Sequence, residues 1–381
     1  MKNSIIPYVL LPIFLFTIAV SAQKDYKGRV IDGKSKEPIP YVNIGIKEAG
    51  VGTVSDEDGL FHLYLDLNKY EPTAKILFSA LGYETLFIPI ADIKLVYNEY
   101  PDIVLKPKTV ELSEVVVSNK GERFIPDNIG YRNYGDKIYG YWKDNIALGG
   151  ELATRIIAKS GLRKLNEFEF EVWYNPSDSL LVRINIYEDD GKIGKPGTNL
   201  NTSGKNIITT IRKDDRMVRV DLRPYEIYTK DDFIASVELI QVYGEEDLGL
   251  ILSATIARNG SYRKYASQDA WEYLSPTNMA YNVKSDLMVS EKQAQRFERR
   301  TEKKKMKQPT LSGFVIMRGR MISEVNVLNN TTKESVVSDA NGRYVIRAKK
   351  GDILTFSKDG LKDFSFRVTD KITQNAVMKS K

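Results

Sequence analysis

The feature that most constrains the fold of this chain is an eight-residue stretch that occurs once near each end. The copies are Val54–Phe61 (Val-Ser-Asp-Glu-Asp-Gly-Leu-Phe) and Val337–Tyr344 (Val-Ser-Asp-Ala-Asn-Gly-Arg-Tyr). Each copy places Asp or Asn beside Gly between apolar residues, which is the composition of a tight turn joining two strands. The chain is therefore expected to contain two hairpins of the same kind.

Three further signals flank each copy in the same order. The pairs are Gly28-Arg-Val30 with Gly313-Phe-Val315, Val42-Asn-Ile44 with Val325-Asn-Val327, and Ile76-Leu-Phe-Ser79 before Gly82 with Ile353-Leu-Thr-Phe-Ser357 before Gly360. Similar spacing of several separate signals is typical of an internal repeat. Short strand-like runs without a helical stretch surround the first copy, so we predict a small β-sandwich at each end.

On these motifs both copies resemble the carboxypeptidase-regulatory-like, transthyretin-like domain of exported Bacteroidetes proteins. The second copy departs from the pattern where Glu324 replaces Tyr41 and Leu361 replaces Tyr83. The resemblance implies a β-sandwich that serves as a structural or interaction module and carries no chemistry of its own.

A valine-rich segment follows the first copy, Glu111-Leu-Ser-Glu-Val-Val-Val117. It resembles the segment after the same domain in SusC-type TonB-dependent receptors, where it engages the energy-transducing partner. The alternative is a strand that fills the linker or adds to a sheet edge. The residues that follow are too few for the many strands and the plug of a receptor barrel, so we do not expect such a receptor.

The middle of the chain predicts a second type of sandwich. Glu167–Tyr174 alternates, with Phe168, Phe170, Val172 and Tyr174 expected to face inwards and three glutamates outwards. Further strand-like runs surround the polar loop Gly191–Gly204, and a jelly-roll-like sandwich is predicted. The loop motif Gly194-Lys-Pro-Gly197 and the run Val220-Asp-Leu222 resemble an uncharacterised domain often found behind the regulatory-like module.

The predicted fold class is all-β, with two transthyretin-like or Ig-like modules flanking a jelly-roll-like middle domain. The predicted parts are a signal peptide (1–22), the first module (23–107), a linker with the valine segment (108–122), the middle sandwich (123–285), a basic helical or extended linker (286–310) and the second module (311–381).

The first residues predict export. Lys2 precedes the almost wholly apolar run Ile5–Val20, and Val20-Ser21-Ala22 offers small residues for cleavage. A membrane anchor is the alternative, but the apolar run is short, and we expect no transmembrane segment in the mature chain. With no cysteine the chain forms no disulfide, as is common in bacterial periplasmic and surface proteins.

The net charge of +6 is concentrated in one segment. Glu291–Gln308 holds eight Lys or Arg residues against three Glu, and the rest of the chain is nearly neutral. This distribution gives no argument for nucleic-acid binding, and a solvated linker face explains the basic run better than contact with acidic lipid or polysaccharide.

The sequence offers no group of residues for metal or nucleophilic catalysis. His62 is the only histidine and there is no cysteine, whereas a hydrolytic zinc site needs several such ligands and a catalytic triad needs its own base. His62 is expected on an outer strand face, since Val345 takes its place in the second copy. We predict no catalytic residue, metal or cofactor, although paired carboxylates for glycoside hydrolysis stay open.

Calcium binding is the competing interpretation of the repeated turns. Asp56-x-Asp58-Gly59 begins like an EF-hand loop, but the twelfth position is Leu67 in one copy and Lys350 in the other, where a bidentate Glu is needed. We therefore favour turns in which Asp caps its own backbone and Gly takes positive φ.

Aromatic residues give the candidate binding residues. They are concentrated in the first and last segments of the middle domain. The five candidate binding residues are Tyr139, Tyr141, Trp142, Trp271 and Tyr273. Exposed aromatics at one end of a jelly roll would stack on sugar rings, although large aromatics more often lie in a core.

The predicted function is that of a non-enzymatic, exported binding or scaffolding protein of the bacterial cell envelope, in the periplasm or at the outer membrane or cell surface. The expected partner is an envelope protein. A carbohydrate-binding protein with polysaccharide as ligand is the alternative, and a polysaccharide-acting hydrolase is the third choice.

Overall fold

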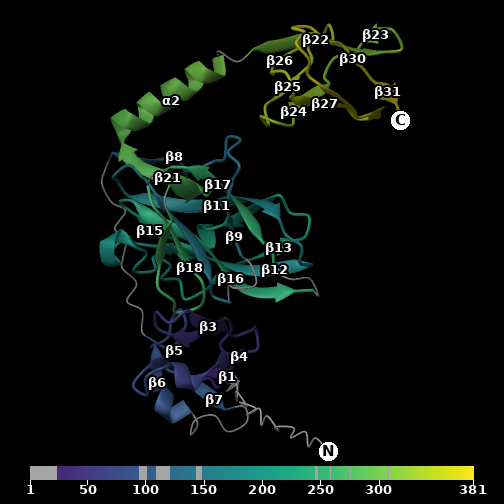
Figure 1. Ribbon diagram of the computed structural model, residues 1–381. Coiled ribbons are helices and arrows are strands. Elements are labelled where there is room, and N and C mark those ends of the chain that lie inside the picture. Colours follow the sequence, from purple (N-terminus) through teal and green to yellow (C-terminus); the bar gives the residue numbers. More distant parts are fainter. Residues whose placement is uncertain are drawn as a thin grey trace, which may run out of the picture. The chain divides into compact units, whose positions relative to one another are not determined.

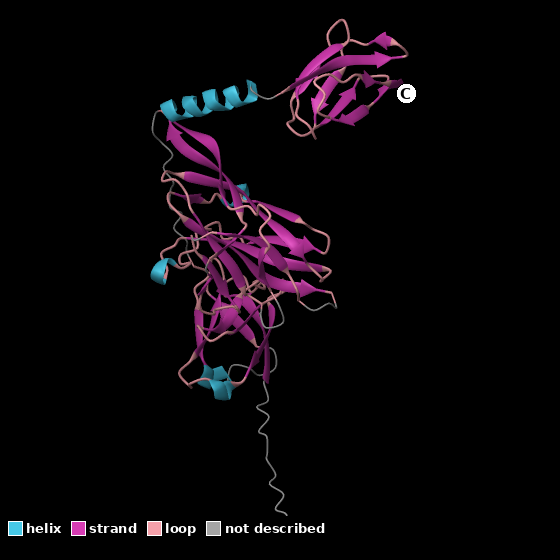
Figure 2. Ribbon diagram, turned by 45° about the horizontal axis from the view of Figure 1, so that its top comes forward, coloured by secondary structure: helices cyan, strands magenta, loops and turns pink. Residues whose placement is uncertain are grey.

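The computed structural model describes residues 24–93, 101–108, 121–142, 148–244, 248–257, 259–274, 276–306 and 309–381. Strands dominate this part of the chain, and α2 (Glu291–Met306) is its long helix (Figure 2). The prediction of an all-β fold is confirmed. None of the helices among these residues is long and apolar enough to cross a membrane. The predicted signal peptide and the valine segment 111–117 lie outside the described residues.

The N-terminal domain is a sandwich of two small sheets around one core (Figure 1). The first sheet has the order β4-β1-β7 and the second β3-β2-β5-β6. The strands are β1 (Lys24–Asp32), β2 (Asn43–Ile46), β3 (Val51–Val54), β4 (Leu60–Leu65), β5 (Lys75–Ser79), β6 (Leu86–Pro89) and β7 (Asp102–Leu105). Alternation along β4 places Phe61 in the core against the ring of Phe78, 5.7 Å away, and leaves His62 exposed on the outer face.

The C-terminal domain repeats this connectivity. Its strands are β22 (Thr310–Met317), β23 (Arg320–Met321), β24 (Asn326–Asn329), β25 (Ser335–Val337), β26 (Arg343–Arg347), β27 (Ile353–Ser357), β28 (Leu361–Lys362), β29 (Phe364–Arg367), β30 (Ala376–Val377) and β31 (Lys379–Ser380). The order β26-β22-β30 corresponds to β4-β1-β7, with the last pair parallel in both domains, and β25-β24-β27-β29 corresponds to β3-β2-β5-β6. The internal repeat in the sequence is thus a repeat of topology.

The repeated turn has the same hydrogen bonds in both domains. Oδ1 of Asp56 accepts the backbone N–H groups two and four residues on, at 3.0 and 2.8 Å, and Oδ1 of Asp339 does the same at 2.9 and 2.8 Å. Gly59 and Gly342 have φ of 73° and 71°. These contacts confirm the interpretation as a capped turn, in which the aspartate satisfies its own backbone and glycine adopts the left-handed conformation.

Replacing Asp56 with alanine is expected to lower the free energy of unfolding by about 1–2 kcal/mol, because two backbone donors lose their acceptor. Asp58→Ala in the same turn is the matched control and should be nearly neutral, since that side chain is exposed. Chemical denaturation with and without calcium measures both effects. A rise in stability with calcium that disappears in Asp58→Ala would establish the metal-loop interpretation instead.

The middle domain is a larger sandwich of two sheets (Figure 1). The six-stranded sheet runs β13 (Ile207–Arg212), β12 (Ser179–Tyr187), β16 (Phe233–Tyr243), β10 (Glu151–Ile156), β18 (Ser261–Lys264) and β19 (Glu272–Leu274). The eight-stranded sheet runs β20 (Thr277–Met279), β17 (Ile251–Ile256), β11 (Arg163–Tyr174), β21 (Asn282–Ser290) and β8 (Glu122–Gly130), joined by β9 (Ile138–Tyr141), β14 (Met217–Asp221) and β15 (Tyr228–Thr229). The inner faces of both sheets enclose one large apolar core.

Two details of the middle region differ from the sequence-based expectation. Tyr174 is 52% exposed, because the register between β11 and β17 shifts between Val172 and Tyr174 and ends the inward alternation. Strand β21 continues to Ser290, so the segment expected to start a linker at residue 286 is still sheet before α2 begins at Glu291.

Candidate functional site

The N-terminal and middle domains belong to one compact unit, residues 1–120 and 124–288. The hairpin of β2 and β3 bonds to the loop after β18. The N–H of Glu48 donates to the carbonyl of Gln268 at 2.9 Å, and the N–H of Gly50 donates to Oδ1 of Asp269 at 3.0 Å. Nε2 of Gln268 donates in turn to Oγ of Ser79 at 2.7 Å. Backbone and side chain together fix the hairpin to the middle domain.

Glycine in the hairpin permits this close approach. A Cβ atom on Gly45 or Gly52 would lie 2.5 or 2.3 Å from the carbonyl oxygen of Ser267, which is closer than real Cβ contacts. The strand registers place Leu328 and Ser335 at the corresponding positions of the C-terminal domain. The second copy therefore lacks the two glycines with which the first copy docks.

An apolar contact supports the docking at one end of the six-stranded sheet. Val54 of the N-terminal domain packs with Leu181 and Ile240 on the outer face of that sheet, and Tyr41 borders the cluster. In Figure 1, β3 lies on the side of the N-terminal domain that faces β12 and β16.

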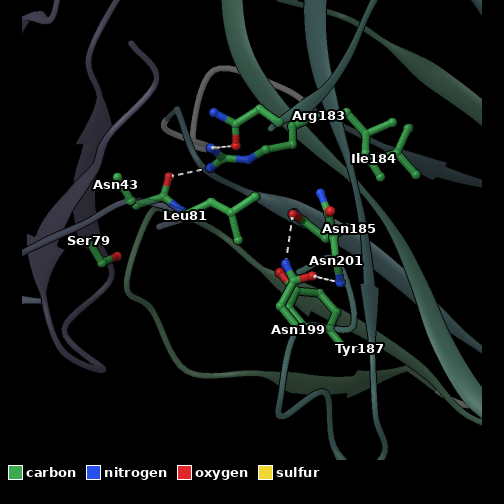
Figure 3. A pocket seen from close by; sticks show the side chains of 12 residues that line it. Asn43, Ser79, Leu81, Arg183, Ile184, Asn185, Tyr187, Asn199 and Asn201 are labelled. Atoms are coloured by element: carbon green, nitrogen blue, oxygen red, sulfur yellow. Dashed lines mark hydrogen bonds between the residues drawn. The ribbon is translucent and has the colours of Figure 1, made fainter. Parts of the chain in front are cut away.

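Arg183 on β12 forms a buried ion pair within the middle domain and also hydrogen-bonds to the N-terminal domain. Its guanidinium donates from Nε and Nη2 to the two carboxylate oxygens of Glu238, both at 2.7 Å, and the side chains are only 6% and 1% exposed. It also donates to Oδ1 of Asn43 at 2.7 Å (Figure 3). Further acceptors are the carbonyl of Tyr41 at 2.9 Å and Oδ1 of Asn206 at 3.3 Å. A planar guanidinium is suited to satisfying this many acceptors at once.

The charges in this interior determine the protonation of Glu238. Burial alone would raise the pKa of Glu238, but the positive charge and hydrogen bonds of Arg183 outweigh burial and hold that pKa below its usual value. Burial, followed by the charges of Glu151 and Glu238, raises the pKa of the nearby Tyr187 hydroxyl well above normal. The site thus holds Glu238 as an ionised carboxylate and Tyr187 as a neutral phenol.

A second polar cluster continues from Glu238 across the same sheet face. The carboxylate of Glu151 accepts the hydroxyl of Ser236 at 2.6 Å and that of Tyr187 at 3.1 Å, and it pairs with Lys264. The ammonium of Lys264 also lies 4.6 Å from the ring centroid of Trp271, a cation–π arrangement. Asn185 joins the clusters, because its Nδ2 donates to Glu238 at 2.7 Å.

Two pockets lie between the domains, over this network. The smaller pocket is about 200 Å³, and its side chains include Asn43, Ser79, Leu81, Arg183, Asn185, Tyr187, Asn199, Asn201 and Asn206 (Figure 3). The larger pocket is about 740 Å³, and its side chains include Lys47, Glu48, Leu77, Ser79, Phe87, Lys192, Lys195, Lys264, Asp269 and Trp271. Both pockets have one wall from each domain.

The structure does not bring the five predicted aromatic residues together. Trp142 is 1% exposed and donates its indole N–H to the carbonyl of Gly150, so the prediction that it is available to a ligand is wrong. Tyr139 and Tyr141 lie on β9 in the eight-stranded sheet, with their rings 6.2 Å apart. Tyr273 is exposed on β19 beside Tyr262. Of the five, only Trp271 lines a pocket between the domains.

Sequence reasoning missed the polar residues of β12 and β16. The sequence predicts strand-like runs here, but the prediction did not use the alternation of polar and apolar residues along them. Arg183, Asn185 and Tyr187 alternate with buried aliphatic residues on β12, and Ser236 and Glu238 do so on β16. Polar residues at every second position of otherwise apolar strands indicate a buried polar face.

In the part of the chain that the structure describes, no group of three or more His, Asp or Glu residues is arranged to hold a metal ion. His62 lies in the N-terminal domain, where its Nδ1 is 3.2 Å from the carboxylate of Asp25. The arrangement between the domains is suited to binding a polar ligand.

Comparison with known proteins defines the class of the N-terminal domain. Residues 26–117 match the family model of the CarboxypepD_reg-like domain. A stretch of 125 residues is 34% identical to TonB-dependent receptor P39 of Formosa agariphila, and this match covers 32% of the chain but only 11% of the receptor.

Solved structures resemble the chain only weakly. The major pilin subunit of Bacillus cereus gives a TM-score of 0.17 at 10% identity, over 94% of this chain and 99% of that one. The pilus 2b backbone protein of group B streptococcus gives 0.16 at 9% identity, over 68% and 98% of the two chains. These TM-scores are too low to support an argument about function.

Proposed function

We propose that the chain is a non-enzymatic, exported scaffolding protein of the bacterial cell envelope that binds another envelope protein. The family match of residues 26–117 and the partial identity with a TonB-dependent receptor support the envelope location. The site between the domains offers charged and hydrogen-bonding groups that can bind a ligand.

The proposal includes a second CarboxypepD_reg-like domain at residues 311–381. The shared strand order and the shared capped turn support this assignment. We retain residues 23–107 and 311–381 as the extents of the first and third domains, with the signal peptide before them, and strand β21 extends the middle domain, predicted as 123–285, to Ser290.

One observation favours the C-terminal domain as the partner-binding part. In the N-terminal domain the outer face of the sheet β3-β2-β5-β6 docks on the middle domain, and Val54 is 4% exposed. Val337 takes the place of Val54 in the register of the C-terminal domain and is 62% exposed, with Ile353 also exposed on the same sheet. This sheet face of the second copy is therefore the proposed docking surface.

Site-specific photo-crosslinking in living cells tests this function. A photoreactive residue at Val337 should give adducts with an envelope protein. Val345, which is exposed on the other sheet of the same domain, is the matched control position and should give few adducts. Equal labelling from both positions, or a cytoplasmic location of the chain on fractionation, would contradict the proposal.

A further inference from the structure

The two pockets between the N-terminal and middle domains adjoin each other, and together they are named the cleft. Ser79 lines both of them. The ring of Tyr187, at the end of the smaller pocket, contacts the ring of Trp271 in the larger pocket, with centroids 6.1 Å apart. The two adjoining pockets together offer room for a ligand longer than one small molecule.

The narrow end of the cleft is built for uncharged polar groups. Five asparagine side chains line it, namely Asn43, Asn185, Asn199, Asn201 and Asn206. Several are held in place by neighbours: Asn185 bonds to Glu238, and Nδ2 of Asn201 donates to the carbonyl of Lys205 at 2.8 Å. Amide side chains both donate and accept hydrogen bonds, as does a ligand hydroxyl group. Fixed amides of this kind are preorganised for a ligand rich in hydroxyls.

The wide end of the cleft combines aromatic rings with a net positive charge, since four lysines line it against the two carboxylates of Glu48 and Asp269. Phe87 of the N-terminal domain is 53% exposed on one wall, and Trp271 of the middle domain lies on the other. Lys195 donates to the carbonyl of Trp271 at 2.6 Å, so its charge is held at the cleft without a carboxylate in that contact. Lys47 and Lys192 are exposed at the same end.

We propose that this cleft binds an acidic oligosaccharide. Hydroxyl groups of the sugar bond to the asparagines at the narrow end, and the apolar faces of the sugar rings pack against Phe87 and Trp271 at the wide end. Carboxylate or sulfate groups of the ligand pair with the lysines. This site is separate from the C-terminal surface proposed for the protein partner. The oligosaccharide proposal and the protein-partner proposal can therefore be tested independently.

The features of the cleft favour a saccharide over an acidic peptide. A peptide that binds at a sheet edge depends on backbone hydrogen bonds, whereas the narrow end of the cleft presents side-chain amides. Charge alone would bind both ligands through the lysines. The asparagine amides and the two aromatic walls are what favour a sugar ring with several hydroxyl groups over a peptide that carries carboxylates.

Calorimetric titration of the full chain tests the proposal. The probes are a tetrasaccharide of hexuronic acid, a neutral glucose tetrasaccharide and a short glutamate peptide. The uronate should bind at least about tenfold more tightly than either of the others, and added salt should weaken its binding. Absence of uronate binding, or equal binding of the glutamate peptide, would overturn the proposal. A failure of uronate binding would not change the result expected from photo-crosslinking at Val337, which tests the protein partner.

Two substitutions locate the site. Phe87→Ala and Lys192→Glu alter exposed side chains on opposite walls and should each weaken uronate binding by about tenfold. Tyr139→Ala removes an equally exposed aromatic from the other sheet and should leave binding unchanged. Thermal unfolding verifies that each variant is folded. Loss of binding in Tyr139→Ala with retention in both cleft variants would place the ligand on the eight-stranded sheet and contradict the cleft.

Discussion

Arg183→Met is expected to lower the free energy of unfolding by about 3–5 kcal/mol, because it leaves a buried carboxylate without its partner. Glu238 is 1% exposed and receives two hydrogen bonds from this one side chain. The double variant Arg183→Met/Glu238→Leu removes both charges and should recover most of the loss. Chemical denaturation of the wild type and the two variants measures the difference. If the double variant is less stable than Arg183→Met, the ion pair is not the source of the effect.

The destabilisation by Arg183→Met should also depend on pH. In the wild type the pKa of Glu238 lies below its ordinary value of 4.5, so the stability from its ionised form is present above that value and is lost as the pH falls through the lower folded pKa. Without Arg183, burial dominates and raises this pKa above its value in the unfolded chain. The stability gap between variant and wild type should therefore narrow as the pH falls from neutrality towards 4.5. A gap that is constant with pH would show that lost packing causes the effect.

Trp142→Ala is expected to cost about 3–5 kcal/mol of unfolding free energy, since it empties a large volume of the middle core. It also removes the indole donor that bonds to the carbonyl of Gly150 at 3.3 Å. Trp271→Ala is the matched comparison, because that ring lies half-buried beside Tyr187 and Lys264 and its loss should cost much less. Denaturation midpoints of the two variants measure the two losses of stability. A larger loss in Trp271→Ala than in Trp142→Ala would mean that Trp142 does not belong to the core.

Local chemistry made the repeated module predictable from the sequence. The capped turn depends on an aspartate that bonds two and four residues further on and on a glycine with positive φ, and all of these lie within a few residues. The flanking strands follow in the same order along the chain in both copies, so the repeat also predicted them. The error at Tyr174 has a non-local cause, because the register shift depends on the partner strand β17.

Docking between the N-terminal and middle domains could not be predicted from strand patterns. It depends on Ser267 approaching the glycines of a hairpin far away in the sequence. A signal was nevertheless present in the comparison of the two copies. Gly45 and Gly52 stand where the second copy has Leu328 and Ser335, and glycine in a strand interior is costly unless another backbone comes close.

The aromatic residues show why binding sites are hard to predict from composition. Trp142 and Tyr141 are neighbours in the sequence, yet the tryptophan is in the core and the tyrosine ring lies beside Arg263, whose guanidinium carbon is 4.6 Å from the ring centroid. A crowd of aromatics predicts a core and a surface equally well. Of the predicted aromatics the cleft contains Trp271, and its other lining residues, such as the asparagines, the lysines and Phe87, come together only because two domains meet.

Amide hydrogen exchange at Glu48 tests most directly whether the N-terminal and middle domains form one rigid unit around the cleft. Its N–H lies in the turn of the hairpin and bonds to Gln268 of the middle domain. If the domains stay docked, this amide should be protected to nearly the same degree as the amides of the adjoining six-stranded sheet. Exchange as fast as that of an exposed turn, with both domain cores still protected, would show that the domains separate and would contradict the rigid cleft.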